Sequence, residues 1–333
     1  MLWESGELYL LDQSRLPHEE LRVKCQTTET VFEAISSLKV RGAPAIGIAA
    51  AYGLLVDTGP LIKLSELERR CLYLDSARPT AVNLAWALNR MLAKARELSR
   101  DGLVVVSELL LEASAIHGED RQSCQAIGDY GRPLLKGMNN LLTHCNAGSL
   151  AVSEYGTALA PIYRACTEGQ SLHVYVDETR PLLQGARLTS YELARHGVDH
   201  TLITDNMAAY VMSLGRVDGV IVGADRVTAN GDVINKIGTL NLAILCQFYS
   251  IPFFVACPCS TIDLDTASGA SVEIECRSAE EVRRFSDSLI CLSNTPVFNP
   301  AFDVTPASLV AALITDRGVI KQPNAQQLKD ISA

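Results

Sequence analysis

The chain reads Leu141-Leu142-Thr143-His144-Cys145-Asn146-Ala147-Gly148-Ser149, where a short apolar run meets small and polar residues, and a helical pattern starts near Leu150. This order predicts a buried β-strand, a turn and the N-terminus of a helix. The first N–H groups of a helix have no partner within the helix, and its dipole is positive there, so the turn is suited to an anion and to a thiolate. Cys145 is therefore a candidate reactive group beside a phosphate site, although most cysteines at strand ends are simply small buried residues.

Short apolar runs alternate with helical patterns from about residue 137 onward. The expected strands are 140–144, 172–176, 200–203, 219–222, 253–256 and 289–292, and the expected helices are 150–167, 185–196, 206–215, 236–249 and 279–286. Repeated β-α-β units of this length predict a parallel sheet that is covered by helices on both faces. Ligands of such sheets bind at the carboxyl ends of the strands.

The first third of the chain is mostly helical in pattern. Helices are expected at 28–38, 45–56, 65–74, 82–98, 102–116 and 120–135, and short strands at 8–11 and 21–25. The sequence thus predicts an α/β protein with two domains, a mostly helical N-terminal domain (1–136) and a parallel-sheet domain (137–333).

Composition excludes several classes of function. The 333 residues are 48% hydrophobic and 20% charged, and the net charge of −9 argues against general nucleic-acid binding while leaving room for a small anionic substrate. The ten cysteines form no CxxC pair, which favours reduced thiols over a disulfide framework or a zinc site. No signal peptide and no apolar run of about 18–20 residues is present, so we expect a cytoplasmic protein without a membrane segment.

Three polar clusters fall where predicted strands end: 145–148, 177–180 and 223–226. Asp225 follows an apolar strand, and desolvation there would raise the pKa of its carboxyl toward the range of proton transfer; a turn or capping aspartate is an equally good interpretation. Gln184 stands at the start of the next helix, where its amide can donate to a ligand. Asp177, Arg180 and Arg187 are equally consistent with a structural network.

Other candidates for phosphate binding lie at helix starts. Arg41 can pair with phosphate bidentately, and Gly42, before Ala43, allows close approach of the backbone. Arg78 precedes another helix, but on local sequence it reads as a solvated loop arginine. Asn235 and Lys236 lie in an expected turn into a helix, and on local sequence Lys236 reads as a surface lysine.

Two further features are weaker. Cys257 and Cys259 end another strand and hint at metal or redox chemistry, but no nearby histidine or third cysteine completes a site, which favours loop packing. His144 and Cys145 are neighbours on a strand and should point to opposite faces, which argues against a Cys–His dyad. GxSxG, Walker A and GxGxxG motifs are absent from the sequence.

Taken together, these segments resemble the methylthioribose-1-phosphate isomerase family, aldose–ketose isomerases of methionine salvage. The motifs that carry the resemblance are Leu10-Leu11-Asp12-Gln13, Val40-Arg41-Gly42-Ala43-Pro44-Ala45-Ile46-Gly47, Arg78-Pro79-Thr80-Ala81-Val82-Asn83-Leu84, Thr143-His144-Cys145-Asn146-Ala147-Gly148, Asp177-Glu178-Thr179-Arg180-Pro181, Leu183-Gln184-Gly185-Ala186-Arg187, Gly223-Ala224-Asp225-Arg226, Asn235-Lys236-Ile237-Gly238-Thr239 and Asn299-Pro300-Ala301-Phe302-Asp303. They occur in one order from about residue 8 to 320.

The resemblance implies a helical N-terminal domain, a Rossmann-like C-terminal domain, a homodimer, and neither a metal nor an organic cofactor. It implies that Cys145 and Asp225 are the catalytic pair. It also implies a set of residues that bind the phosphate and hydroxyls of a phosphosugar substrate: Arg41, Gly42, Ala43, Arg78, Gln184, Asn235 and Lys236.

Two other functions remain open at the level of sequence. The regulatory subunits of translation initiation factor 2B share this fold and are not isomerases. Ribose-1,5-bisphosphate isomerase is a related enzyme whose pocket must hold a second phosphate. Within the first interpretation, 5-deoxyribose 1-phosphate fits an apolar pocket as well as the methylthio sugar does.

Overall fold

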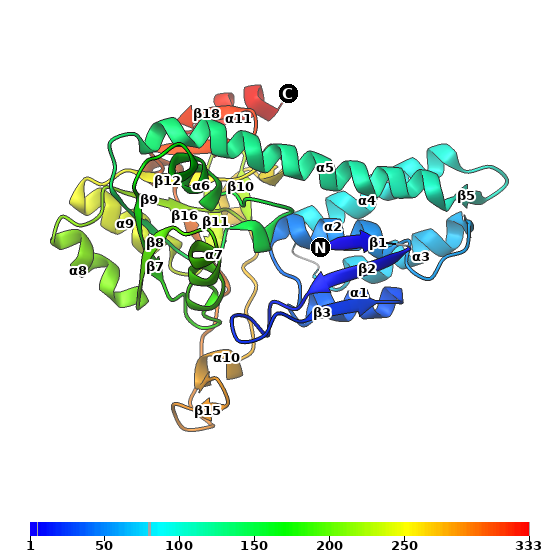
Figure 1. The fold of residues 1–333 in the computed structure, drawn as a ribbon, viewed down its shortest axis with the longest axis horizontal. Coiled ribbons are helices and arrows are strands. Elements are labelled where there is room, and N and C mark those ends of the chain that lie inside the picture. Colours follow the sequence, from blue (N-terminus) through cyan, green and yellow to red (C-terminus); the bar gives the residue numbers. More distant parts are fainter. Residues whose placement is uncertain (5, 79–80, 333) are drawn as a thin grey trace. The chain divides into compact units, whose positions relative to one another are not determined.

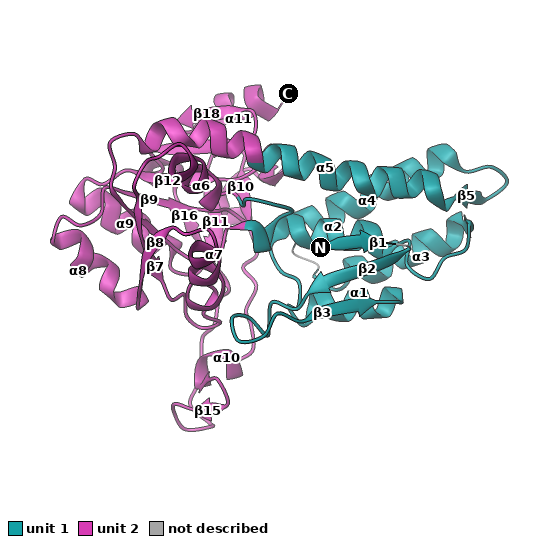
Figure 2. Cartoon of the chain, viewed as in Figure 1, with its two compact units in different colours: residues 1–124, 149–156 teal, residues 125–148, 157–333 magenta. Residues whose placement is uncertain are grey.

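The computed structural model describes residues 1–4, 6–78 and 81–332 and shows an α/β protein (Figure 1). The chain forms two compact units: residues 1–124 with 149–156, and residues 125–148 with 157–333 (Figure 2). This division differs from the expected boundary at 136/137, because the chain passes from one unit to the other between Cys124 and Gln125 and later returns to the first unit for eight residues.

The first unit consists of helices and a small antiparallel sheet. The sheet has the order β1 (Leu2–Glu4), β2 (Glu7–Leu11) and β3 (Arg22–Cys25), and a ribbon pairs β4 (Leu61–Lys63) with β5 (Leu103–Val105). The helices are α1 (Thr28–Ser36), α2 (Ala43–Gly53), α3 (Leu64–Asp75), α4 (Val82–Leu98) and α5 (Val106–Gly131), which continues into the second unit. Helix α2 is buried along most of its length because its small residues allow close packing; a Cβ at Gly47 would lie 2.7 Å from the Asn83 carbonyl oxygen of α4.

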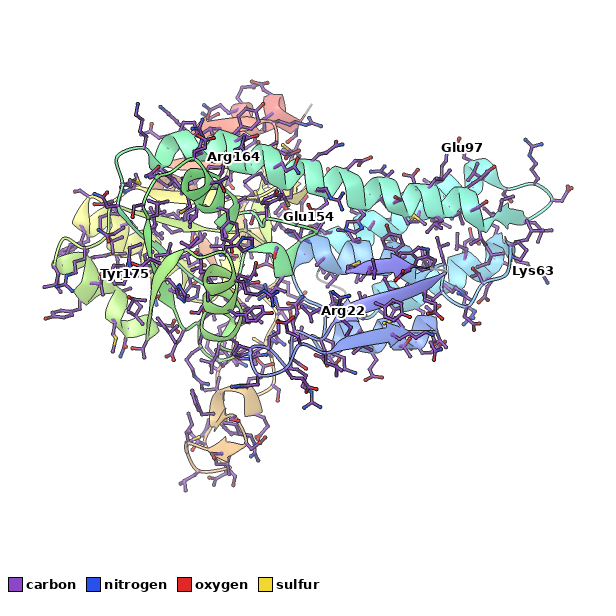
Figure 3. All side chains as sticks on the ribbon, viewed as in Figure 1. Arg22, Lys63, Glu97, Glu154, Arg164 and Tyr175 are labelled. Carbon is purple, nitrogen blue, oxygen red and sulfur yellow. The ribbon has the colours of Figure 1, made fainter. Side chains whose placement is uncertain are left out.

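The segment 149–156 is fixed to this first unit by polar contacts. The Ser153 N–H donates to Asp120 Oδ2 (2.7 Å), Glu154 (labelled in Figure 3) pairs with Arg121 of α5 at 3.0 Å, and the Gln13 amide donates to the Leu150 carbonyl oxygen (2.7 Å). The first unit is therefore completed by residues that come after β6 (Asn140–Thr143) in the chain.

The second unit is built on a seven-stranded sheet. Its order is β18 (Gly318–Lys321), β17 (Ala312–Thr315), β12 (Phe253–Ala256), β9 (Gly219–Val222), β6 (Asn140–Thr143), β7 (His173–Asp177) and β8 (Asp199–Ile203). All neighbours are parallel except β17 and β18. Five of the six expected strands are these parallel strands, and β17 was not expected.

Helices cover both faces of this sheet. Leu142, Val220 and Val255 point into one apolar core with α8 (Ala208–Ser213) and α9 (Thr239–Tyr249). Their neighbours Leu141, Ile221 and Phe254 point into the other core, with the end of α5 and with α6 (Leu159–Thr167). Arg164 of α6 is also paired with Asp129 of α5 at 2.6 Å. The expectation of a parallel sheet covered on both faces is confirmed.

The remaining elements of the second unit are short. A π-helical turn η3 (Gly185–Thr189) leads into α7 (Ser190–Arg195), and a 3-10 turn η4 (Asp205–Met207) leads into α8. A second sheet has the order β13 (Ile262–Asp263), β10 (Arg226–Thr228), β11 (Val233–Lys236) and β16 (Phe302–Thr305). α10 (Glu280–Arg283) precedes a hairpin of β14 (Arg284–Phe285) and β15 (Ser288–Leu289), which replaces the expected strand 289–292, and α11 (Ala325–Ser332) ends the chain.

Two helix expectations are wrong. The expected helices 102–116 and 120–135 form the single helix α5, because Gly118 between them has open space around it and costs a helix only about 1 kcal/mol relative to alanine. The expected helix 150–167 starts only at Leu159, because Tyr155 and Gly156 have positive φ and residues 149–151 form one 3-10 turn. Within the described part of the chain, no helix combines the length and apolar character that crossing a bilayer requires.

Candidate functional site

The direction of the sheet's connections reverses between β6 and β9. β7 and β8 extend the sheet from one side of β6, whereas β9, β12 and β17 extend it from the other. Numbered along the chain, the six parallel strands have the order 3-2-1-4-5-6, and ligands of such sheets bind at the carboxyl ends of the strands where the order reverses. Cys145 follows β6 and Asp225 follows β9, so both lie at that point.

The loops that carry these two residues are in contact. Thr143 Oγ1 donates to the Ile221 carbonyl oxygen (2.8 Å), and a Cβ at Gly223 would lie 2.9 Å from the Cβ of Ala147. The glycine thus allows the loop after β9 to pack against the loop after β6. Asp225 is partly buried, and its N–H donates to the Ile234 carbonyl oxygen of β11 (2.9 Å). The structure therefore places the two predicted catalytic residues on adjoining loops of one unit.

Cys145 is held in a left-handed backbone conformation, with φ of 61°. Such a conformation costs a non-glycine residue about 1–2 kcal/mol, so the surrounding contacts must maintain it. The Cys145 N–H donates to Thr179 Oγ1 (2.8 Å), and its carbonyl oxygen accepts from Thr189 Oγ1 (2.6 Å). The expectation that Cys145 stands at a helix N-terminus is wrong, since α6 begins fourteen residues later, at Leu159. Two threonines, not a helix end, position this thiol.

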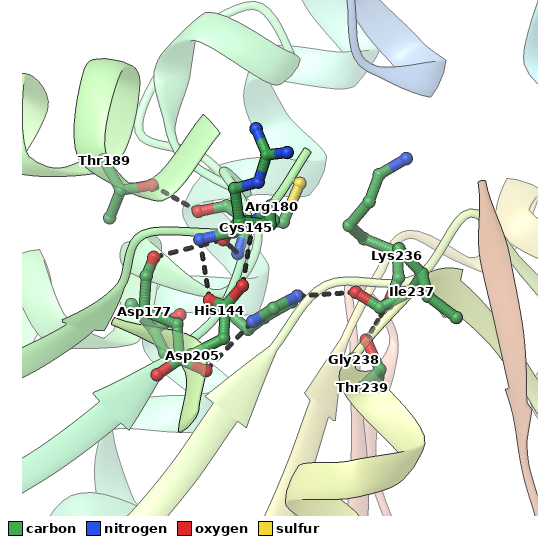
Figure 4. A network of polar contacts seen from close by, with 12 residues as sticks. His144, Cys145, Asp177, Arg180, Thr189, Asp205, Lys236, Ile237, Gly238 and Thr239 are labelled. Atoms are coloured by element: carbon green, nitrogen blue, oxygen red, sulfur yellow. Dashed lines mark hydrogen bonds and ion pairs between the residues drawn. The ribbon is translucent and has the colours of Figure 1, made fainter. Parts of the chain in front are cut away.

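His144 is buried and uses both ring nitrogens. Nδ1 lies 3.0 Å from Asp177 Oδ2, and Nε2 lies 2.9 Å from the Ile237 carbonyl oxygen (Figure 4). A carbonyl oxygen only accepts, so Nε2 carries a hydrogen and donates it. Burial raises the pKa of Asp177 to about 6, although the bond to His144 acts in the opposite direction. Burial lowers the pKa of His144, but the bond to Asp177 and its charge outweigh that effect and raise the pKa overall. His144 is therefore bound elsewhere and does not activate Cys145 as a dyad partner.

Asp205 holds the backbone of the loop that follows β7. Its two oxygens accept the N–H groups of Thr179 and Arg180, each at 2.8 Å. The Arg180 guanidinium donates to the carbonyl oxygens of Pro181 and Val282, both at 3.0 Å. Asp177 Oδ2 is bonded to the ring of His144, which is not a partner that the expected network of Asp177 with Arg180 and Arg187 includes.

His144, Asp177 and Asp205 are also the residues that could hold a cation. One ligand atom from each lies within 4.8 Å of the others. However, both nitrogens of His144 and both oxygens of Asp205 take part in hydrogen bonds within the protein. A metal would have to break these bonds, so the cluster is better suited to holding a proton between Asp177 and His144.

Three predicted substrate-binding residues lie in the same unit as Cys145 and Asp225. Gln184 is 7% exposed, and its Oε1 is buried without a hydrogen-bond partner. Asn235 is 6% exposed and donates to Thr239 Oγ1 (3.0 Å). Lys236 is 7% exposed, donates to the Ala301 carbonyl oxygen (2.9 Å) and lies over the Phe302 ring (4.5 Å). Asn235 and Lys236 belong to β11 and not to a turn, and the surface interpretation of Lys236 is wrong.

The other predicted binding residues belong to the first unit. Arg41, Gly42 and Ala43 stand at the start of α2, and Arg78 precedes α4. Gly42 has φ of 97°, and a Cβ there would lie 2.3 Å from the Ala151 carbonyl oxygen, so this position requires glycine. Pro79 and Thr80 of the same predicted motif lie outside the described residues.

All ten cysteines are free thiols. Cys257 is buried in the core beneath β12, and Cys259 Sγ lies 3.9 Å from the Ile331 carbonyl oxygen. Burial raises the pKa of both thiols, that of Cys259 to about 11. These contacts favour the packing interpretation of the pair over a metal site.

Several residues of this site could not be singled out from the sequence, apart from their position along the chain. Thr179, Thr189 and Asp205 act through bonds to segments that lie 25 to 44 residues away in the chain. Asp303 of β16 accepts the N–H groups of Gly238 (2.7 Å) and Leu240 (3.2 Å) at the start of α9. Only the fact that polar residues follow predicted strands could have pointed to Thr179 and Asp205.

Comparison with known proteins shows close relatives over the whole chain. Residues 39–322 match the initiation factor 2 subunit family. A protein of Chloroflexus aurantiacus named methylthioribose-1-phosphate isomerase is 50% identical, covering 99% of this chain and 97% of its own. A protein of Moorella thermoacetica named 5-deoxyribose 1-phosphate isomerase is also 50% identical, covering 99% and 96%. The structure of 5-methylthioribose 1-phosphate isomerase from Pyrococcus horikoshii is similar with a TM-score of 0.90 and 43% identity, covering 99% of this chain and 94% of that one.

Proposed function

Because this chain belongs to the initiation factor 2 subunit family and to the aldose–ketose isomerases within it, we propose that it converts 5-methylthioribose 1-phosphate to 5-methylthioribulose 1-phosphate in methionine salvage. The observation that carries the proposal is the contact between the loops after β6 and β9, which brings Cys145 and Asp225 to the point where ligands of such sheets bind. The names of the relatives support the choice of substrate.

The substrate determines what the site must do. An ordinary aldose opens spontaneously to an aldehyde, but here O1 carries the phosphate, so the ring opens only if the bond between C1 and the ring oxygen is cleaved with the help of an acid. A hydrogen must then move from C2 to C1. Two titrating groups are sufficient for both steps, and each such group contributes about 10²–10⁴-fold to the rate.

We assign the acid role to Asp225 and the carbon-bound proton to Cys145. In this proposal, protonated Asp225 delivers its proton to the ring oxygen as the ring opens. Cys145 then removes the proton from C2, which leaves an enol that still carries the phosphate, and delivers a proton to C1. The hydroxyl proton on O2 passes to the Asp225 carboxylate, which has given its own proton to the ring oxygen, and C2 becomes the ketone. The opposite assignment of the two residues is one alternative. A hydride shift from C2 to C1 with proton relay between the oxygens is another, and the experiment in deuterated water below separates it from the enolate route. Water must be excluded, because an enolate phosphate can eliminate phosphate or be protonated at the wrong carbon.

Substrate binding is assigned to residues around these loops. Lys236 supplies a buried positive charge, and one of its three hydrogens goes to the Ala301 carbonyl oxygen. The Gln184 side chain, whose Oε1 is buried without a bond, is suited to the sugar hydroxyls, as is the Asn235 amide. The resemblance also assigns substrate binding to Arg41, Gly42, Ala43 and Arg78. The Rossmann-like description of the second unit and the homodimer remain predictions from the resemblance, and the cytoplasmic location remains a prediction from the sequence.

A second substrate has support from the comparisons. Relatives of 50% and 48% identity are named 5-deoxyribose 1-phosphate isomerase. This sugar carries a bare methyl group where the other carries a methylthio group, so one apolar pocket can accept both. Ribose 1,5-bisphosphate instead needs a basic pocket for its second phosphate.

Turnover of the three sugar phosphates by the purified protein, followed by phosphorus and proton NMR, tests the proposal. We expect the highest kcat/KM for the methylthio sugar. A preference for the deoxy sugar would reassign the substrate, and no turnover of any sugar would favour a regulatory subunit of translation initiation factor 2B. In deuterated water, deuterium at C1 of the product indicates the enolate route, and its absence indicates a hydride shift.

A further inference from the structure

His144 is buried between two loops that carry residues of the proposed site, and the mechanism above does not use it. On one side its own backbone leads directly into Cys145; on the other its Nε2 donates to the carbonyl oxygen of Ile237, the residue after Lys236 (Figure 4). We propose that His144 is a positioning residue that fixes Cys145 relative to Lys236. The inference rests on the proposed function.

The Cys145 side of this link is rigid. Thr179 Oγ1 accepts the Cys145 N–H and donates to the Asp177 carbonyl oxygen (3.1 Å), while the Asp177 carboxylate binds the ring of His144. The Thr179 N–H is held in turn by Asp205. Backbone and side-chain bonds from β7 and from the loop after β8 thus converge on the two residues that follow β6.

The Lys236 side is equally well defined. Gly238 has φ of 104°, and a Cβ there would lie 2.8 Å from His144 Cε1, so the imidazole ring lies directly against this backbone. Asp303 accepts the N–H groups of Gly238 and Leu240 from the opposite strand. In the view of Figure 4, the side chains of Cys145 and Lys236 extend to the same side, away from the strands, while the His144 ring lies beneath them. A small rotation of the His144 ring would therefore move the segment that carries Cys145 and the segment that carries Lys236.

The charges around His144 favour its imidazolium form. Asp177 on β7, Asp205 after β8 and Asp303 on β16 face it, and Lys236 opposes them from β11. A neutral ring that still donates from Nε2 would present a lone pair at Nδ1 to the Asp177 carboxylate. Both bonds are therefore made best by a doubly protonated ring, in agreement with the raised pKa of His144.

Two substitutions of His144 each retain one of its two hydrogen bonds, the one to Ile237 or the one to Asp177. His144→Gln places an amide near the position of Nε2, where it can still donate to the Ile237 carbonyl oxygen. His144→Asn places an amide near Nδ1, where it can bind Asp177 but not Ile237. If the link to Ile237 positions Cys145, we expect His144→Asn to lower kcat about 100-fold with little change in KM, since a displacement of about 1 Å can cost that much. His144→Gln should recover most of the lost kcat.

The control for a purely structural effect is Val174→Ala. Val174 lies on β7, like Asp177, but its side chain is in the apolar core. It should lower the melting temperature as much as His144→Asn does while leaving kcat per folded molecule unchanged. Equal loss of kcat in His144→Asn and His144→Gln, or in Val174→Ala, would overturn the proposal.

A readout that needs no substrate distinguishes failure of this inference from failure of the proposed function. Alkylation of Cys145 by iodoacetamide, measured by peptide mass spectrometry, reports its surroundings directly. We expect the rate to change by at least about threefold in His144→Asn and to stay near the wild-type rate in His144→Gln and Val174→Ala. If the wild type turns over none of the sugars, the function fails, and these rates alone decide whether His144 positions Cys145; unchanged rates in all variants refute it.

Discussion

A cysteine closely follows two strands of the same sheet, and the two cysteines differ in exposure, backbone conformation and contacts. Cys145 after β6 is partly exposed, has a strained backbone and is bonded to two threonines. Cys257 after β12 is 1% exposed and packs in an apolar core, where burial raises the pKa of its thiol well above the usual value. The difference teaches that a cysteine at a strand end is a candidate reactive group when the loops beside it carry polar residues. Such loops lie next to Cys145 because the strand order reverses between β6 and β9.

Serine substitutions at the two strand ends test the comparison with the largest effect. Cys145→Ser should lower kcat by up to about 10⁴-fold, because the serine hydroxyl is a far weaker acid than a thiol and does not ionise to the base that removes the proton from C2, while the melting temperature stays unchanged. Cys257→Ser should leave kcat unchanged and lower the free energy of unfolding by about 1–3 kcal/mol, because a hydroxyl is buried among apolar groups. NMR turnover and urea unfolding of both variants decide; the reverse pattern would remove Cys145 from the site.

Asp225→Asn sharpens the comparison at the neighbouring strand end. The amide keeps the shape of the carboxyl but cannot donate a proton to the ring oxygen, so kcat should fall about 10²–10⁴-fold. Substrate affinity, measured by calorimetry under conditions without turnover, should change little. A variant with near-normal kcat would contradict the assignment of the acid.

Lys236→Ala tests whether this lysine binds the phosphate of the substrate. Loss of a charge-assisted hydrogen bond of about 1.5–3 kcal/mol should raise KM about 10- to 100-fold. Initial rates over a range of substrate concentrations provide the measurement. Lys236→Arg is the matched control that retains the charge, and an unchanged KM in the alanine variant would exclude contact with the phosphate.

The thiol of Cys259, close to the end of β12, should differ from exposed thiols in how its rate of alkylation depends on pH. The thiolate is the reacting form, and burial raises the pKa of Cys259, two residues after Cys257, to about 11. Its alkylation in the folded protein should therefore be slow at pH 8 and rise about tenfold per pH unit toward pH 11. The exposed Cys276 and Cys291 serve as internal references. Labelling of Cys259 at pH 8 as fast as these references would contradict its burial.

The smallest effect concerns the stability that His144 contributes beneath Cys145. Its pKa is raised in the folded protein, so this stabilisation is complete below the unfolded pKa near 6.5 and is lost as pH rises through the folded pKa. The difference in unfolding free energy between wild type and His144→Asn should therefore shrink from pH 6 to pH 9, by at most about 1.4 kcal/mol per unit of pKa shift. Urea titrations at the two pH values measure it, and a difference that grows with pH would contradict the imidazolium form.

The sequence predicts the large sheet well and the site only in part. The apolar runs Gly219–Val222 and Phe253–Ala256 become central parallel strands, because a strand buried on both faces must be apolar throughout. The second sheet escapes prediction, because strands such as Arg226–Thr228 are short, and one of the two neighbours of this strand, Ile262–Asp263, lies more than thirty residues later in the chain.

The misjudged residues share one cause. Lys236 reads as a surface lysine because its contacts with Ala301 and Phe302 come from residues more than sixty positions later in the chain. Cys145 reads as a helix start because nothing local reveals that residues 149–156 join the first unit instead of continuing a helix. His144 is the same case, with partners 33 and 93 residues away.

The return of residues 149–156 to the first unit has a consequence for how the protein is made. During synthesis, the N-terminal 124 residues leave the ribosome before Ala151, Ser153 and Glu154, which supply contacts to Gly42, Asp120 and Arg121. The first unit therefore cannot make all of its contacts until residues 149–156 have been synthesised. A fragment that ends at residue 124 lacks the part of its interior that these residues supply. Engineers who wish to express this unit alone need to graft the eight residues onto it.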